Sequence, residues 1–314
     1  MSHFTVLVIG EDVEEQLAKY NENLEIEFQD ETAEWQNDYE TKTCHMKKLP
    51  DGRVVFPWDP EFSSKIPFEK PVFPEGATDV EVPQKERYAT FEEYVTEWHG
   101  HDLSTPCGYW RNPDAKWDWY MVGGRWTGYF KLKPGEVGEI GEPGVMTSFC
   151  DDEDRADIAR KGDIDFDGMV AEHLEEKQLQ YQNFHEMVKG RAIPLWRDVL
   201  SMCEYRGGTV DDARKIYNNN EVIVDLREAG VFWLEDSFIE KMLLPLKEYL
   251  KKESKQALST FAVVKDGVWY ERGEMGWFAT VANEKDADTW LEEWYNLVMS
   301  MPDDTLLTVV DCHI

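Results

Sequence analysis

The sequence has few basic side chains for its 314 residues. Its 33 Lys and Arg residues face 64 Asp and Glu residues, so the formal net charge is −31 at pH 7. A field of this sign repels the phosphates of nucleic acids and of anionic membranes, and we therefore expect no direct binding to DNA, RNA or a membrane. The charge instead favours contact with a basic protein surface, or it serves solubility alone.

Long hydrophobic runs and paired cysteines are also missing. No apolar run approaches the roughly 18 residues that a membrane helix needs, and the start MSHFTVLVIG lacks the basic segment of a secretory signal. The five cysteines are an odd number at wide spacings, which gives no disulfide framework. These absences predict a soluble cytoplasmic protein with reduced thiols.

Motifs for nucleotide binding and catalysis are absent as well. Residues 4–10 have the β-branched pattern of a buried strand that ends in glycine, but neither G-x-G-x-x-G nor G-x-x-x-x-G-K-[ST] follows. The next residues, Glu11 and Asp12, would repel a phosphate group. There is also no G-x-S-x-G, C-x-x-C or H-E-x-x-H pattern. No reaction can be assigned, and the residues favour a protein that is not an enzyme.

The order of predicted elements indicates an α+β fold. Strong strands are predicted at both ends of the chain, at residues 4–10 and 305–314, and Asp266-Gly267 marks a hairpin between two apolar runs. We expect the N- and C-terminal segments to form one mostly antiparallel sheet, with a helical middle region inserted between them. The expected parts are a β-rich region at 1–150 with a proline-rich excursion at 49–83, a helical region at 151–256, and a ββαβ unit at 257–314.

Capping patterns place several helices. Thr90 and Glu93 form an S/T-x-x-E box before a short helix that Gly100 ends, and Thr209 and Asp212 form a second box. A long helix is predicted from residue 236 to about residue 256, with Pro245 kinking or dividing it.

The segment KWDWYMVGGRWTGYF, residues 116–130, is the most distinctive part of the sequence. Arg125 follows a Gly-Gly turn and has aromatic neighbours, an arrangement that grips a carboxylate or phosphate while a ring stacks on a planar group. The alternative is an aromatic hairpin core in which Arg125 pairs with Asp118 or another carboxylate. A ligand cleft that also includes the later WYERGEMGW segment has these candidate residues: Trp117, Trp119, Tyr120, Arg125, Trp126 and Arg272.

Metal sites are not favoured. The stretch DIDFDG supplies Asp163, Asp165 and Asp167 at the first positions of a calcium loop, but the bidentate Glu that should end such a loop is replaced by Leu174. Acidic residues before a helix N-terminus explain the same pattern. Near the C-terminus, Asp311, Cys312 and His313 offer metal ligands or a nucleophile with a base, but no metal-binding pattern accompanies them. Asp311 and His313 share one face of an extended strand while Cys312 points to the other, so the geometry is poor for a local Cys-His dyad. We therefore expect no cofactor, with calcium as the weak alternative.

Several blocks carry a resemblance to a known family. MSHFTVLVIG, NPDAKWDWYMVGGRWTGYFKLKPG with GEPGVM and RKGDID, and FAVVKDGVWYERGEMGW with MPDDTLLTVVDCHI resemble a family of uncharacterised proteins encoded by bacteriophages and prophages. The blocks cover about a third of the chain, and the region from about residue 24 to residue 83 lies outside them. The resemblance implies a phage gene expressed in the cytoplasm of a bacterial host, and it implies no particular activity.

Two functional hypotheses follow. The first is an acidic phage accessory protein that binds a host protein, such as one with a basic nucleic-acid-binding surface, and acts as a counter-defence inhibitor. The second is the binding, sequestration or processing of a small anionic planar ligand, such as a nucleotide signal, in the cleft of Trp and Arg residues. A structural role in a virion is a third alternative. The sequence gives no oligomeric state.

Overall fold

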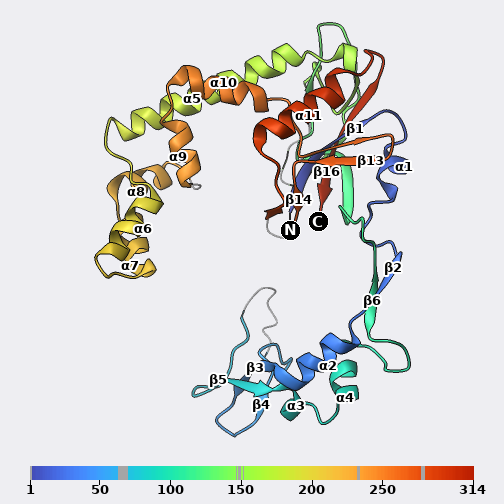
Figure 1. Ribbon diagram of the computed structural model, residues 1–314, viewed down its shortest axis with the longest axis vertical. Coiled ribbons are helices and arrows are strands. Elements are labelled where there is room, and N and C mark those ends of the chain that lie inside the picture. The colour runs from blue at the N-terminus through green and yellow to red at the C-terminus, as the bar shows by residue number, and fades with distance from the viewer. Residues whose placement is uncertain are drawn as a thin grey trace. The chain divides into compact units, whose positions relative to one another are not determined.

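The computed structural model describes residues 2–62, 70–145, 147, 150, 152–231, 234–276 and 280–314. The chain forms two compact units (Figure 1). Unit 1 consists of Met1–Lys19 and Lys116–Ile314, and unit 2 is Tyr20–Ala115. These boundaries differ from the expected division at residues 150 and 256. The reason is that residues 20–115 build a core of their own, whereas the strand that follows them pairs with the C-terminal strand.

The sheet of unit 1 joins the two ends of the chain, as predicted. Its strand order is β13-β12-β1-β16-β7-β9, and β11 also pairs with β16. The β1–β12 and β7–β9 pairs are parallel and the other pairs are antiparallel, which confirms a mostly antiparallel α+β fold. The strands are β1 (His3–Ile9), β7 (Trp119–Gly124), β9 (Glu142–Pro143), β11 (Ile158–Arg160), β12 (Ala262–Lys265), β13 (Val268–Glu271) and β16 (Leu306–His313).

One face of this sheet is covered by helix α11 (Ala287–Met299). Alternation along β1 puts Leu7 and Ile9 on that face, where Trp290 and Trp294 of the helix pack against them. The indole N–H groups of these two tryptophans donate to Thr260, so the large rings are buried without an unpaired donor. The short helix α1 (Val13–Ala18) follows β1, and its Leu17 is fully buried.

The helical middle has a second core within unit 1. Phe184, Tyr217, Ile223 and Tyr249 are among its buried members. Helices α5 and α10 contact each other along this region (Figure 1), and Pro245 divides the predicted long helix into α9 and α10, as expected. The helices are α5 (Phe166–Val188), α6 (Trp196–Tyr205), α7 (Val210–Asn218), α8 (Glu221–Glu228), α9 (Asp236–Met242) and α10 (Leu246–Gln256).

Short elements complete unit 1. The predicted Thr209 and Asp212 capping box is formed at the start of α7. The Asp266-Gly267 turn joins β12 to β13, with positive φ at both turn residues. The remaining elements are β8 (Phe130–Lys131), β10 (Arg155–Ala156), η1 (Lys161–Asp163), β14 (Glu274–Met275) and β15 (Val281–Ala282).

Unit 2 packs Trp35, Met46, Tyr88 and Tyr94 in its core. Part of the proline-rich stretch 49–83 contributes strands to a sheet in the order β4-β3-β5, and residues 63–69 lie outside the described residues. Thr90 caps α4 as predicted, accepting a hydrogen bond from the backbone N–H of Glu93 at 3.1 Å. The elements are β2 (Glu27–Asp30), α2 (Thr32–Thr41), β3 (Thr43–Lys48), β4 (Val54–Val55), β5 (Thr78–Pro83), α3 (Gln84–Arg87), α4 (Phe91–Trp98) and β6 (Gly108–Arg111).

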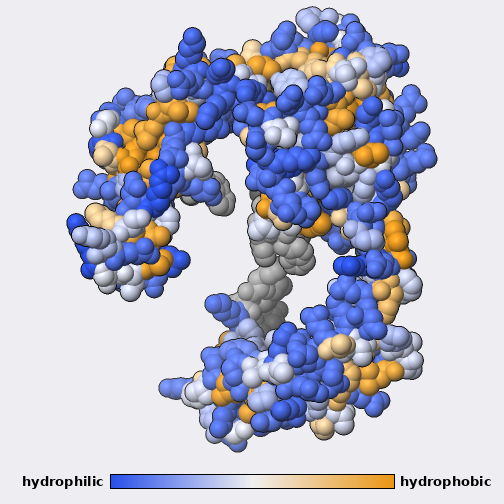
Figure 2. Space-filling view, viewed as in Figure 1, coloured by the Kyte–Doolittle hydropathy of each residue, from blue (hydrophilic) through white to orange (hydrophobic). Residues whose placement is uncertain are grey.

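Hydrophilic residues predominate on the face seen in Figure 2, in line with the net charge of −31. Across the described residues, none of the helices has both the length and the apolar character that crossing a membrane requires.

Candidate functional site

The Gly-Gly turn of the aromatic segment folds around two buried carboxylates. Gly123 and Gly124 have φ values of +79° and +58°, in the region that favours glycine. A Cβ on Gly123 would lie 2.5 Å from Oδ2 of Asp157, and one on Gly124 would lie 2.5 Å from Oδ2 of Asp311. The glycines are therefore required because the backbone approaches these side chains too closely for any other residue.

Asp157 accepts several hydrogen bonds from this segment. The backbone N–H groups of Gly128, Tyr129 and Gly141 donate to its carboxylate at 2.7, 3.2 and 2.9 Å, and the Thr127 hydroxyl donates at 3.1 Å. The side chain is fully buried. These donors replace the water that the carboxylate loses on burial, so the conspicuous sequence pattern serves the fold.

The aromatic candidates lie in packed positions. Trp117 is buried, and its indole N–H donates to the backbone oxygen of Leu17. Tyr120 meets the Trp117 ring edge to face, whereas Trp119 stacks on the imidazole of His313. Trp126 packs against the sheet core. Trp117 and Tyr120 thus pack against each other, whereas Trp119 and Trp126 have other partners.

Arg125 is exposed, and the expected pairing with Asp118 is not found. Its backbone N–H donates to Asp311 at 2.9 Å, while Asp118 pairs with His313 instead. Arg125 takes part in none of the ion pairs between described residues.

The sixth candidate, Arg272, lies away from the other five. It follows β13, which is separated from β7 by the three strands β12, β1 and β16. Four strand spacings correspond to about 19 Å. Nε of Arg272 donates to Glu284 at 2.6 Å. Arg125 and Arg272 therefore follow strands in different parts of the sheet.

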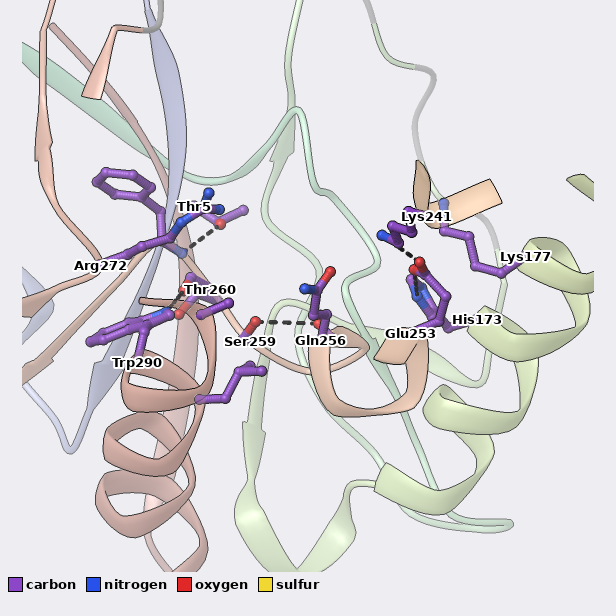
Figure 3. Close-up of a pocket in the computed structure, with 13 residues that line it drawn as sticks. Thr5, His173, Lys177, Lys241, Glu253, Gln256, Ser259, Thr260, Arg272 and Trp290 are labelled. Carbon is purple, nitrogen blue, oxygen red and sulfur yellow. Dashed lines mark hydrogen bonds and ion pairs between the residues drawn. The ribbon is translucent and has the colours of Figure 1, made fainter. Parts of the chain in front are cut away.

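Arg272 does line a pocket of about 470 Å³ in unit 1, shown in Figure 3. Arg272 and Thr5 lie on one side, and His173, Lys241 and Glu253 lie on the other. We call this the cationic pocket. Its lining residues are Thr5, His173, Lys177, Lys241, Glu253, Gln256, Ser259, Thr260, Phe261, Arg272, Ala287, Trp290 and Leu291.

The charge of this lining is opposite to that of the chain. Lys177 comes from α5, Lys241 from α9 and Arg272 from the end of β13, so three separate elements supply the positive charges. Glu253 of α10 is the single carboxylate among the described residues of the lining. In a chain with a net charge of −31, this cavity gathers three cations, and each also has a carboxylate partner: Lys177 pairs with Glu176, Lys241 with Glu253 and Arg272 with Glu284.

Glu253 holds the helical side of the cationic pocket together. It is 3% exposed, forms an ion pair with Lys241, and its Oε2 lies 3.4 Å from Nε2 of His173. Burial alone raises the pKa of this carboxyl. The attraction of His173 and Lys241 outweighs that effect, and the pKa lies below its ordinary value of 4.5. Nε2 of His173 is buried and faces the Glu253 carboxylate.

The lining also contains neutral groups. Thr5 and Ser259 contribute hydroxyl groups, and the partly buried ring of Phe261 supplies a flat apolar surface. A neighbouring pocket of about 620 Å³ shares Lys241 and Gln256 with it. Lys177 follows His173 by one helical turn in the sequence. This spacing indicates that the two side chains share one face of a helix, and it was the only hint in the sequence of the helical side of the pocket. Nothing in the sequence connects that turn to Arg272.

The calcium pattern has a structural explanation. Oδ1 of Asp165 accepts a hydrogen bond of 2.9 Å from the backbone N–H of Gly168 and so caps α5. Asp163 lies in η1 and Asp167 lies in the first turn of α5. Within the described ranges, no group of three or more His, Cys, Asp or Glu side chains is arranged to hold a metal ion.

Comparisons with known proteins add no relative. No protein-family model, curated protein or solved structure matches this chain.

Proposed function

We propose that unit 1 binds a small anionic ligand, such as a nucleotide, in the cationic pocket. The observation that carries the proposal is the convergence of Lys177, Lys241 and Arg272 on one cavity of a strongly acidic chain. The proposed ligand class is that of the second hypothesis drawn from the sequence, but the proposed site is different. Of the six candidate residues, Arg272 is the one that lines the cationic pocket.

Size and shape support this class of ligand. A volume of about 470 Å³ lies within the range of pockets that hold small molecules, roughly 300 to 1,000 Å³. The lysines act as point charges toward a phosphate, and a guanidinium offers a fork of donors. Phe261 gives a planar group a surface on which to stack.

Isothermal titration with inorganic phosphate, pyrophosphate and nucleotides tests the proposal. A ligand that binds the folded state raises the melting temperature, because about 2.7 kcal/mol is added at 100 times its dissociation constant. Arg272→Gln and Lys177→Gln should each weaken binding about tenfold. Arg125→Gln is the matched control, since Arg125 is also exposed but does not line the cationic pocket. Binding that is absent from the whole series, or equally weakened by Arg125→Gln, would contradict the proposal.

A second candidate function is the binding of a basic host protein through unit 2. Trp58 and Trp98 are 58% and 41% exposed and lie against each other and against Phe56, with ring centroids 4.9 to 6.2 Å apart. Glu97 precedes Trp98 on α4 and pairs with Arg87, whose guanidinium lies over the Phe56 ring of the cluster. Exposed tryptophans with acidic neighbours suit a protein surface that carries Lys and Arg. The resemblance to phage proteins is the reason to look for the partner in a bacterial host.

Capture from a bacterial lysate distinguishes this candidate. A partner retained in stoichiometric amount at low salt should be released at high salt and should be lost with Trp58→Ala. Trp110→Ala is the control, because Trp110 is similarly exposed on β6. Retention that Trp58→Ala leaves intact would count against this surface.

A further inference from the structure

Two histidine–aspartate pairs lie side by side at one end of the unit 1 sheet. His3 of β1 is directly opposite His313 of β16, and His313 is in turn opposite Trp119 of β7. The ring centroids of His3 and His313 are 4.9 Å apart. This cluster is formed by both ends of the chain, and it is separate from the cationic pocket.

Each imidazole is held by a carboxylate at the same ring nitrogen. Nδ1 of His3 lies 2.8 Å from Oδ1 of Asp311, and Nδ1 of His313 lies 2.6 Å from Oδ1 of Asp118. Both carboxylates accept a further backbone hydrogen bond, Asp311 from Arg125 and Asp118 from Trp119. The Trp119 ring stacks on His313 with an interplanar angle of 15°. The rings are therefore fixed in orientation.

This arrangement selects one tautomer. A carboxylate accepts the Nδ1–H of a neutral imidazole, and the lone pair is then on Nε2. Nε2 of His313 is buried and has no hydrogen-bond partner among the residues that the structure describes. A buried polar atom without a partner requires an explanation, and an ion is one of the usual ones.

The two carboxylate charges of this cluster also favour a bound cation. Asp311 is fully buried, and its ion-pair partner among the described residues is His3; Asp118 has His313. A single divalent cation balances the same charges and uses the lone pairs.

We propose that His3 and His313 bind one divalent transition-metal ion, such as Zn²⁺, through their Nε2 atoms. Two Nε2 atoms at about 2.0–2.1 Å from a tetrahedral ion place their ring centroids about 5 Å apart, close to the observed 4.9 Å. Imidazole suits Zn, Cu and Ni, and a carboxylate on the other nitrogen is the usual support of a metal-bound histidine.

The site has open coordination positions. No third His, Cys, Asp or Glu ligand accompanies the two histidines in the described part of the chain. The side chain of His3 is 12% exposed, which gives an ion and its water ligands access from solvent. Water therefore completes the coordination of the ion.

Metal titration of the chelator-treated full chain tests the site. ZnCl₂ should bind with one high-affinity equivalent by calorimetry, and His3→Ala should weaken that event at least tenfold. Asp118→Asn should weaken it about tenfold to a hundredfold, because it removes the carboxylate that orients His313. His45→Ala is the control, since His45 is exposed and pairs with Asp79 and Glu81 in unit 2. It should leave the one-equivalent event unchanged.

A spectroscopic readout avoids dependence on variants that fold poorly. Long-range ¹H–¹⁵N correlation of the intact protein should show both histidines as Nδ1–H tautomers and should show Zn²⁺ shifting both Nε2 resonances. Doubly protonated rings, unshifted Nε2 resonances, or Zn²⁺ binding that His3→Ala leaves intact would each overturn the proposal.

Discussion

The carboxylate of Asp157 accepts a hydrogen bond of 2.7 Å from the backbone N–H of Gly128. Three further donors reach the same side chain, so the segment that follows the Gly-Gly turn is wrapped around one buried charge. The aromatic segment that attracts attention in the sequence is thus held in place by a residue some 30 positions later in the chain.

Asp157→Asn should lower the free energy of unfolding by about 2–3 kcal/mol. The amide group that replaces one carboxylate oxygen is a donor, and it would face backbone donors that then lack a partner. Urea unfolding measures the change. Asp303→Asn is the control, because the Asp303 side chain is 85% exposed and should change stability little. Equal effects of the two substitutions would show that the buried hydrogen bonds contribute nothing.

Gly124→Ala should destabilise unit 1 by about 3 kcal/mol. The new Cβ combines backbone strain at a φ of +58° with a separation of 2.3 Å from Cβ of Asp311. Gly190→Ala has a similar φ of +74° but no heavy atom within 4 Å, and it should cost only about 1 kcal/mol. Thermal unfolding compares the two variants. A smaller loss at Gly124 than at Gly190 would contradict the close approach.

Acidification should weaken the helical side of the cationic pocket through Glu253. Its pKa is below the ordinary 4.5, so the ionised carboxylate contributes stability above about pH 4.5, and this contribution is lost as the pH falls through the folded-state pKa. Glu253→Gln should therefore show a flatter decline of stability on acidification. Glu248→Gln, on the exposed side of α10, should retain the slope of the unaltered protein. Denaturant unfolding at several pH values measures these slopes, and identical slopes for both variants would refute the assignment.

Asp165→Ala should destabilise α5 by about 1 kcal/mol, because the helix loses its N-cap acceptor. Asp167→Ala, in the first turn of the same helix, should cost less. Melting temperatures measured with and without added Ca²⁺ separate the two explanations of the DIDFDG pattern. A large rise of the melting temperature on addition of Ca²⁺, abolished by both substitutions, would support the calcium site after all.

Sequence patterns correctly predicted those local structures that depend on neighbouring residues. The capping box at Thr209 and Asp212, the turn at Asp266 and Gly267 and the division at Pro245 were all predicted, because each depends on backbone geometry within a few residues. The mostly antiparallel sheet of the two chain ends also followed from their β-branched runs.

The candidate site could not be predicted from the sequence, because its residues come together only in the tertiary structure. The sequence marked Arg125 and Arg272 by similar aromatic surroundings, but similar local segments say nothing about which strands lie between them, and the sheet separates the two residues by three strands. Unit 2 was likewise not separated from the first 150 residues, because its core depends on contacts across the proline-rich stretch.

The sequence by itself determined the acidic charge, the α+β class, the helix starts after Thr90 and Thr209, and the shared face of Asp311 and His313 on one strand. Only the tertiary structure decided that Lys177, Lys241 and Arg272 line one cavity, and that His3 lies opposite His313. Strand alternation and capping are set by the chain's own geometry over a few residues. The convergence of distant side chains is set by which elements pack together, and that depends on the whole core.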